Sequence, residues 1–345
     1  MGNKKLGFPS NCRVTPRELL VGGRQARDDD RYSYATRIHF LLDDRLGLLA
    51  GCGGTLISRS VVLTAGHCVA LANKDASNVF LRIGAYNPLL DEALKHKYEL
   101  RRAARIVTHP GYVQLPEDQP TSPNDLALIL LDKPASADFP LVHLANETTA
   151  YPAKDTLMHA VGWGSTDPDN SQPAYSLQDL DLPAVSLEQC RQQWSYAGAA
   201  PSLLGEGHLC AGLQAQRNIC FGDSGGPLLL TGASTAEDVQ LGITSFSFPV
   251  CALPGMPGVF TFIPHYRQWI DEQLAQLDPP PPPPAPPSTP PPSTPPPQPP
   301  TAAEEGGSSA AQQLAGSGAE AMAGEPAPAA QAEAPAPEPA ISPVS

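Results

Sequence analysis

Between Ile38 and Phe262 the sequence breaks into short apolar runs, each four to eight residues long and bounded by Gly, Pro, Asn or Asp. The runs are rich in Val, Ile, Leu, Thr and Phe, which are common in β-strands. They are Ile38–Leu42, Ser60–Thr64, Asn78–Ile83, Asp125–Leu131, Thr156–Val161, Pro227–Leu230, Val239–Phe246 and Gly258–Phe262. Many short strands without helical periodicity between them predict an all-β fold, an antiparallel sandwich or barrel.

One segment at the end of this region has the periodicity of a helix. Apolar positions recur every three or four residues from Tyr266 to Leu277, and Pro279 then ends the helix. No internal repeat is visible. Residues 1–19 are polar and aperiodic, and we interpret them as a leader or pro-segment.

The last part of the chain, residues 279–345, has a different composition. It holds 22 of the 41 prolines and six Glu, but no Trp, Tyr, Phe, Cys, Lys, Arg or Asp. Such a segment cannot bury enough apolar surface to fold, so we predict a disordered Pro/Ala-rich tail. Its Pro279–Pro300 part is expected to be an extended polyproline II spacer. Its Ser-Thr-Pro repeats resemble O-glycosylated or hydroxyproline-rich stalks, although an unmodified extension remains an alternative.

The net charge of −13 divides into −6 for the tail and −7 for the remainder. An acidic protein is not attracted to nucleic acid or to an anionic membrane, so neither is an expected partner. No apolar run is long enough to span a bilayer. A signal peptide is not visible either, because Gly7, Pro9 and Ser10 stand where its apolar core belongs.

Three short motifs carry chemistry. His67 follows a predicted strand in Ala65-Gly66-His67-Cys68, and Asp125 begins another strand. Alone, that histidine is typical of a structural role and that aspartate of a turn or a cap. Ser224 differs, because Gly222, Gly225 and Gly226 surround it and free the backbone to point its amides inward.

The order His67, Asp125, Ser224, with gaps of 58 and 99 residues, resembles the chymotrypsin-like (trypsin-family) serine proteases. Further matching segments run through the globular part: Leu20–Gly23, Cys52–Ile57, Gly162–Gly164, Ser245–Ser247 and Pro257–Phe260. The resemblance implies a protease domain over residues 20–278, made of two packed six-stranded antiparallel β-barrels with a C-terminal helix. It also implies protein or peptide substrates and protein protease inhibitors as partners.

The seven cysteines alone allow either buried thiols or at most three disulfides with one cysteine left over. The resemblance implies the pairs Cys52–Cys68, Cys190–Cys210 and Cys220–Cys251, which are expected to stabilise the fold by roughly 2–4 kcal/mol each. Cys12 remains, either free or bonded to another molecule. Disulfides of this kind imply an oxidising compartment and hence a secreted protein.

The resemblance also implies a role for each motif residue. Ser224 is the nucleophile, His67 transfers its proton, and Asp125 orients and stabilises the imidazole. The backbone N–H groups of Gly222 and Ser224 are expected to form the oxyanion hole.

The same resemblance implies a zymogen that is cut just before Leu20, whose freed α-amino group pairs with Asp223. Leu19 replaces the usual Arg or Lys before the cut. Trypsin is therefore expected to be a poor activator, and a chymotrypsin-like enzyme or autolysis a better one.

The residues of the primary specificity pocket depart from the tryptic pattern. Asn218, six residues before the serine, stands where trypsins have Asp, and Ile219 is expected to fill part of the pocket. The strand Ser245-Phe246-Ser247 is expected to bind substrate, with Ser247 where an open pocket has Gly, while Gly258 keeps the opposite wall open. We therefore predict a neutral, moderately sized primary residue.

Two other classes compete with the enzyme. One is a pseudoprotease, a binding module on the same fold, although such proteins usually lose a member of the triad. The other is a matrix or cell-wall anchor in which the tail is the functional part.

No cofactor or metal is expected: the other histidines lack ligand spacing. Ala85 and Lys95 also stand where calcium-binding relatives carry Glu. Asn146-Glu147-Thr148 is a weak glycosylation sequon.

Overall fold

The structure is a computed structural model of the whole chain. It describes residues 22–26, 31–43, 48–87, 91, 96–114, 123–167, 170–198, 203–214 and 217–279. The chain separates into two units, 1–283 and 284–345, and the described residues all belong to the first. The expected leader 1–19 with Cys12, the N-terminal Leu20 and the tail beyond Pro279 lie outside the described residues.

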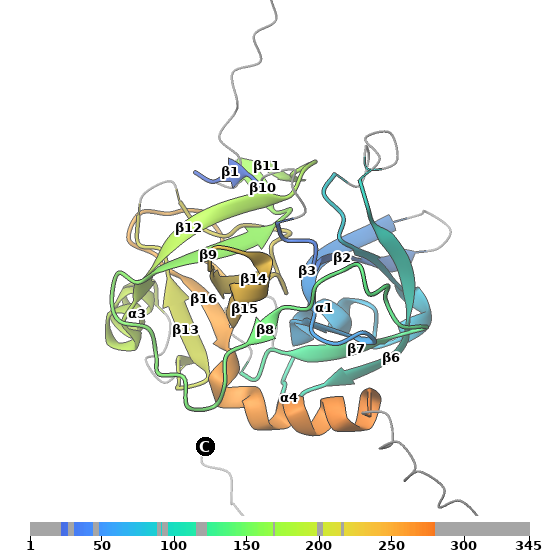
Figure 1. Cartoon of the computed structure of the whole chain (residues 1–345). Coiled ribbons are helices and arrows are strands. Elements are labelled where there is room, and N and C mark those ends of the chain that lie inside the picture. The colour runs from blue at the N-terminus through green and yellow to red at the C-terminus, as the bar shows by residue number, and fades with distance from the viewer. Residues whose placement is uncertain are drawn as a thin grey trace, which may run out of the picture. The chain divides into compact units, whose positions relative to one another are not determined.

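The first half of the described chain forms a closed antiparallel barrel with the strand order β2-β3-β4-β7-β6-β5 (Figure 1). Its strands are β2 (Ala35–Asp43), β3 (Leu48–Leu56), β4 (Val61–Thr64), β5 (Val79–Ile83), β6 (Glu99–Thr108) and β7 (Ala127–Leu131). In β5 buried and half-buried positions alternate, as the period of a strand with one face on a core requires. Fully buried Ile38, Leu63, Leu81 and Leu128 fill the interior.

The second half forms another six-stranded antiparallel barrel, closed by pairing between its first two strands. Its strands are β9 (Leu157–Gly162), β12 (Gln178–Val185), β13 (His208–Ala211), β14 (Pro227–Leu230), β15 (Val239–Phe246) and β16 (Gly258–Phe262). The core contains Met158, Leu182, Leu209 and Phe260. The two barrels confirm the fold expected from the resemblance.

Four further short strands lie outside the two barrels. Strand β1 (Arg24–Gln25) pairs with β12, and β8 (His143–Leu144) runs parallel to β15. Strands β10 (Ser165–Asp167) and β11 (Asn170–Pro173) form a separate hairpin.

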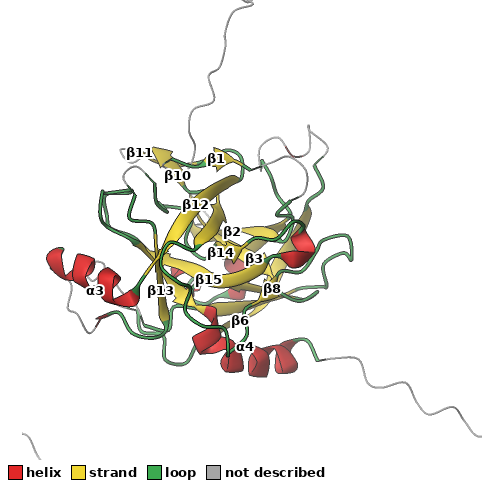
Figure 2. Cartoon of the chain, turned by 60° about the vertical axis from the view of Figure 1, so that its left-hand side comes forward, coloured by secondary structure: helices red, strands yellow, loops and turns green. Residues whose placement is uncertain are grey.

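Among the described residues, three α-helices accompany the strands, and α3 and α4 lie on the outside (Figure 2). They are α1 (Gly66–Leu71), α3 (Leu187–Tyr196) and α4 (Ile263–Leu277); short 3-10 turns span Ala76–Asn78 and Thr235–Glu237. Helix α4 is the predicted helix, extended by one turn that has proline near its start, where a missing N–H costs nothing. Its buried Tyr266 and Ile270 belong to the same apolar cluster as the core of the first barrel. Within the described residues, no helix has the length and apolarity needed to cross a membrane.

Within the described residues, three disulfides join Cys52 to Cys68, Cys190 to Cys210 and Cys220 to Cys251. The first ties β3 to α1, and the second ties α3 to β13. The third joins the segment before Ser224 to the loop after β15. Two of the three bonds therefore hold segments that flank the motif residues.

Candidate active site

His67 lies in the first turn of α1, directly after β4 ends at Thr64. Its Nδ1 is 2.8 Å from Oδ2 of Asp125, and its backbone N–H donates to Oδ1 of the same carboxylate, also at 2.8 Å. Asp125 precedes β7, which pairs with β4, so the sheet register brings the two residues together. The imidazole is 30% exposed and the carboxylate only 3%. Part of the imidazole is therefore accessible to solvent.

The second barrel completes the surroundings of Asp125. The hydroxyl of Ser245, in β15, donates to Oδ2 of Asp125 at 2.5 Å. The hydroxyl of Thr261, in β16, donates to the backbone carbonyl of Asp125 at 2.8 Å. Because these donors come from the opposite barrel, the carboxylate is fixed from both halves of the molecule.

The electrostatic coupling of the pair favours the charged forms of both residues. Burial alone lowers the pKa of His67, but the charge and hydrogen bond of Asp125 outweigh it, so the pKa is raised. Burial alone raises the pKa of Asp125, but the charge of His67 and its hydrogen bonds, with that of Ser245, lower it. This pairing keeps a carboxylate beside a basic imidazole.

Ser224 lies in the loop before β14, on the side of the second barrel that meets the first. Its carbonyl accepts from the N–H of Gly53, in β3, at 2.7 Å, and the next residue, Gly225, donates to Thr244 at 2.8 Å. Gly225 has a positive φ of 77°. Within the described residues, no hydrogen bond joins the Ser224 hydroxyl to His67. Such bonds are often long in unliganded sites and tighten when substrate binds.

The backbone before Ser224 turns sharply at Gly222. The N–H of Asp223 donates to the carbonyl of Cys220 at 3.1 Å, and Gly222 has a φ of 98°, which together define a type II turn. The N–H of Ser165 donates to the carbonyl of Phe221 at 2.8 Å. Because the two ends of a trans peptide point in opposite directions, the N–H of Gly222 points away from Ser165.

Asp223 is buried beneath this turn. Its Oδ1 accepts from the N–H of Gly164 at 2.8 Å, and its Oδ2 accepts from the N–H of Cys220 at 2.9 Å. Burial raises the pKa of Asp223 to about 7, although these two hydrogen bonds and the charge of Arg37 act against it. A Cβ on Gly162 or on Gly164 would overlap the carboxylate, so both positions must lack a side chain.

A pocket of about 190 Å³ opens beside Ser224. Its lining includes four of the residues expected to bind substrate and several others: Ile219, Cys220, Phe221, Ser224, Thr244, Ser245, Phe246, Ser247, Phe248 and Pro249. None of these side chains carries a charge.

Asn218 and Gly258, the other two residues expected in the pocket, lie behind its lining. The Asn218 side chain is buried, accepts from the N–H of Ile219 and donates to the carbonyl of Met256, both at 2.8 Å. A Cβ on Gly258 would lie 2.6 Å from Oδ1 of Asn218 and 3.0 Å from Cγ1 of Ile219. Gly258 therefore gives room to these two side chains.

The sequence analysis did not predict that exposed apolar side chains lie in the pocket lining and next to it in the chain. Phe221 is 55% exposed and Phe248 lines the same pocket, while Val250 is 52% exposed. The Cys220–Cys251 disulfide lies next to both Phe221 and Val250 in the chain and links the two segments. The only available signal was the position of Phe221 directly after Cys220 and two residues before Asp223.

Two clusters within the described residues gather potential metal ligands. In one, His67 lies beside Cys52 and Cys68, but both sulfurs are in a disulfide and offer no thiolate. In the other, His159 meets Asp179 and Asp181, and the guanidinium of Arg24 bonds both carboxylates at 2.9 Å. That cluster is thus neutralised by side chains of the protein itself.

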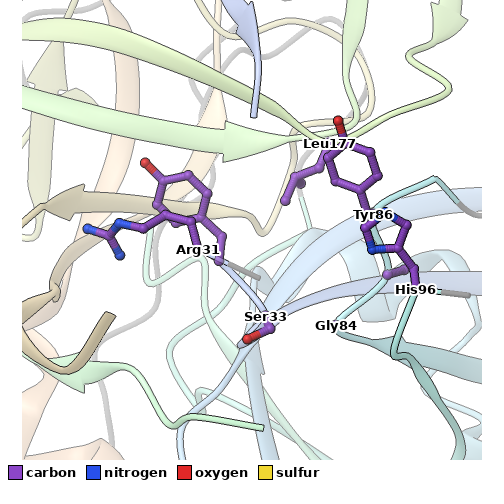
Figure 3. A pocket seen from close by; sticks show the side chains of 8 residues that line it. Arg31, Ser33, Gly84, Tyr86, His96 and Leu177 are labelled. Carbon is purple, nitrogen blue, oxygen red and sulfur yellow. The ribbon is translucent and has the colours of Figure 1, made fainter. Parts of the chain in front are cut away.

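A second hollow, shown in Figure 3, contains none of the motif residues. The rings of Tyr86 and His96 stack there with their centres 4.7 Å apart, and Arg31, Ser33, Gly84 and Leu177 complete the labelled lining. Its free volume of about 10 Å³ is the space of one water molecule. This hollow is too small to bind a substrate.

Two closed antiparallel barrels that meet at an Asp–His pair and a serine loop define the chymotrypsin-like class of serine protease. The family model described as Trypsin matches residues 21–270. The chain therefore belongs to the trypsin family and is a serine-type endopeptidase.

The chain is similar in sequence to three relatives of this family. It is 35% identical to kallikrein-2 of Homo sapiens over 233 residues, which cover 66% of this chain and 81% of the relative. It is 29% identical to trypsin-1 of Salmo salar over 263 residues, 74% of this chain and 96% of the relative. It is 30% identical to the CLIP domain-containing serine protease B8 of Anopheles gambiae over 287 residues, 75% of this chain and 67% of the relative.

Proposed function

We propose that this endopeptidase hydrolyses peptide bonds through Ser224, His67 and Asp125. The Ser224 oxygen attacks the carbonyl carbon while His67 takes its proton, and His67 returns the proton to the leaving nitrogen. A water molecule then hydrolyses the acyl-enzyme by the same route. The observation that carries this proposal is the two-point contact between His67 and Asp125, which leaves Nε2 as the ring nitrogen available for proton transfer.

The oxyanion of each tetrahedral intermediate is proposed to bind the N–H groups of Gly222 and Ser224. The type II turn supports this assignment, because the Phe221 carbonyl is held by Ser165 and the Gly222 N–H points the other way. Loss of one such donor typically costs roughly 10²–10³ in turnover.

The preferred substrate residue at the primary pocket is proposed to be neutral and of moderate size. A buried Lys or Arg side chain needs a carboxylate, and the pocket lining offers none. Ile219 occupies space at the base of the pocket, and the amide of Asn218 is already bonded to the backbone.

The enzyme is further proposed to be made as a zymogen that becomes fully active by cleavage before Leu20. The supporting observation is the burial of Asp223, whose carboxylate organises Gly164 and Cys220 but lacks a cation in direct contact among the described residues. A new α-ammonium group would supply that cation.

The three disulfides favour an oxidising, extracellular location for the enzyme. Protein substrates and protein protease inhibitors are its proposed partners. The Pro-rich tail is proposed to contact a cell wall or matrix, with neither nucleic acid nor a membrane as partner.

A labelled phosphonate that reacts with activated serines tests the catalytic proposal. The protein is prepared with its N-terminus at Leu20, and the labelled residue is identified by peptide mapping. We expect labelling at Ser224 that Ser224→Ala and His67→Ala abolish, while Ser77→Ala, a change in an exposed 3-10 turn, leaves it intact. A folded protein that stays unlabelled and hydrolyses no peptide is a binding module or anchor, and the proposal is then wrong.

A further inference from the structure

Arg37 is a buried arginine on the side of the first barrel that faces the Ser224 loop. It lies in β2 opposite Gly53 of β3, and side chains of such cross-strand pairs point to the same face. A Cβ on Gly53 would lie 2.9 Å from Cα of Gly226, so this face meets the loop directly. A Cβ on Gly51 would lie 3.3 Å from the guanidinium of Arg37.

Arg37 is only 8% exposed, yet it forms no ion pair with a carboxylate among the described residues. Its Nη1 donates to the carbonyl of Trp163 at 3.5 Å, and it lies 5.6 Å from the centre of the Trp163 ring. Arginine is rarely buried without a partner. Burial lowers the pKa of Arg37 to about 10, so the side chain stays charged at neutral pH.

A single peptide group connects Arg37 to Asp223. The carbonyl of Trp163 accepts from Arg37, and the N–H of the same peptide, on Gly164, donates to Oδ1 of Asp223 at 2.8 Å. Hydrogen bonds in such a chain polarise one another, so the cation strengthens the N–H bond to the carboxylate. The positive charge of Arg37 also favours the charged form of Asp223 and so lowers its pKa, although less than the hydrogen bonds from Cys220 and Gly164 do.

We propose that Arg37 is a built-in counter-charge for Asp223 that holds the Cys220–Asp223 turn in its oxyanion-binding form before the chain is cut ahead of Leu20. The inference rests on the proposed function of this site. Arg37 acts on the Asp223 carboxylate through an intervening peptide group, whereas an α-ammonium would contact it directly. Arg37 therefore stabilises the turn less than the α-ammonium would. The uncut chain therefore has a low, Arg37-dependent activity.

The test compares uncut and cut forms of the same protein. A recognition sequence for an added protease replaces residues 16–19, so that cleavage leaves Leu20 first, and mass spectrometry verifies both forms. The measured quantity is the rate at which the labelled phosphonate modifies Ser224. The variants are Arg37→Met, Arg37→Lys and, as a matched control, Arg82→Met on the neighbouring strand, whose guanidinium lies on the Tyr98 ring.

In the uncut form, Arg37→Met is expected to slow labelling roughly ten-fold or more, the effect of removing a nearby opposite charge. Arg37→Lys keeps most of the rate, and Arg82→Met keeps all of it. After cleavage, the Arg37→Met variant is expected to be labelled almost as fast as the parent, because the α-ammonium now supplies the counter-charge to Asp223.

Equal labelling of uncut parent and uncut Arg37→Met would overturn the inference. So would an equal loss in the cut and uncut forms, because a structural defect is not repaired by cleavage. If the cut parent itself remains unlabelled, the proposed catalytic function fails instead, and the two failures are thereby distinguished.

Discussion

Asp125 holds His67 at two points, through Oδ2 to the ring Nδ1 and through Oδ1 to the backbone N–H, each at 2.8 Å. The first contact selects the tautomer of the ring, and the second fixes the position of α1 relative to the start of β7. The same carboxylate therefore sets both the protonation state and the place of the imidazole.

Asp125→Asn is expected to lower kcat by roughly 10⁴, because an amide can hold the ring in the wrong tautomer. KM is expected to change little, since Asp125 is buried beneath His67 and does not line the pocket. Steady-state kinetics of the protein starting at Leu20 measure both. Asp132→Asn, at an exposed carboxylate, is the control. A loss of less than ten-fold would contradict the role given to Asp125.

The pH dependence of kcat/KM is the second prediction. His67 must be neutral to accept the serine proton, and Asp125 raises its pKa above the ordinary value of 6.5. The rate is therefore expected to fall as pH drops through a midpoint above 6.5. In Asp125→Asn the residual activity is expected to show a lower midpoint, because burial alone lowers the pKa of the histidine. An unchanged midpoint in that variant would show that another group controls the profile.

Local patterns were enough to predict the strands that combine β-branched residues with clear turns. Pro227–Leu230, Val239–Phe246 and Gly258–Phe262 have the predicted bounds. Strand β3 was not predicted because glycines interrupt its apolar pattern. At Gly54 a Cβ would collide with Ile38 and Val62, and these contacts between strands cannot be recognised from one segment of sequence. Strand β6 was not predicted because its arginines interrupt the alternation of apolar and polar residues that is typical of a strand.

Helix α3 was not predicted for a different reason: its sequence is mostly polar. It begins at a Ser186 cap, which accepts from Gln189, and is anchored by buried Cys190 and Trp194. At the candidate site, the motifs predicted His67, Asp125 and Ser224, but not Arg37. Arg37 and Asp223 come together only where the two barrels meet, and the spacing of residues along the sequence does not indicate that contact.

Asp223 makes the stability of the uncut chain depend on pH. Burial raises its pKa to about 7, whereas an unfolded aspartate titrates near 3.9. Between these values the folded protein binds a proton that the unfolded chain releases, so this residue makes the free energy of unfolding rise as pH falls from about 7 to about 4. Urea titrations at several pH values should show this slope in the parent and lose it in Asp223→Asn. Identical slopes would contradict the raised pKa.

Gly164→Ala tests how tightly the Asp223 carboxylate is held. The new Cβ would overlap both carboxylate oxygens, so the side chain or the loop must move. A displacement of about 1 Å at a catalytic site can cost on the order of 10² in rate, and we expect a loss of that size. Gly205→Ala is the matched control, because an added Cβ there has nothing within 4 Å. Activity in Gly164→Ala equal to that of the control would show that the carboxylate does not organise the turn.

The last prediction concerns substrate choice and follows from the absence of charged side chains in the pocket lining. In a series of peptides that differ only in the primary residue, Val or Leu is expected to exceed Arg in kcat/KM by roughly 10², because a buried charge without a partner costs about 3 kcal/mol or more. Ile219→Ser replaces a large side chain of the pocket lining by a small one without adding charge. It is therefore expected to raise the relative rate for Phe by roughly ten-fold and to leave Arg a poor substrate. Leu230→Ser, in β14 but outside the pocket, controls for a general loss of packing. A parent profile led by Arg or Lys would contradict the assignment, since it requires a carboxylate that none of the lining residues provides.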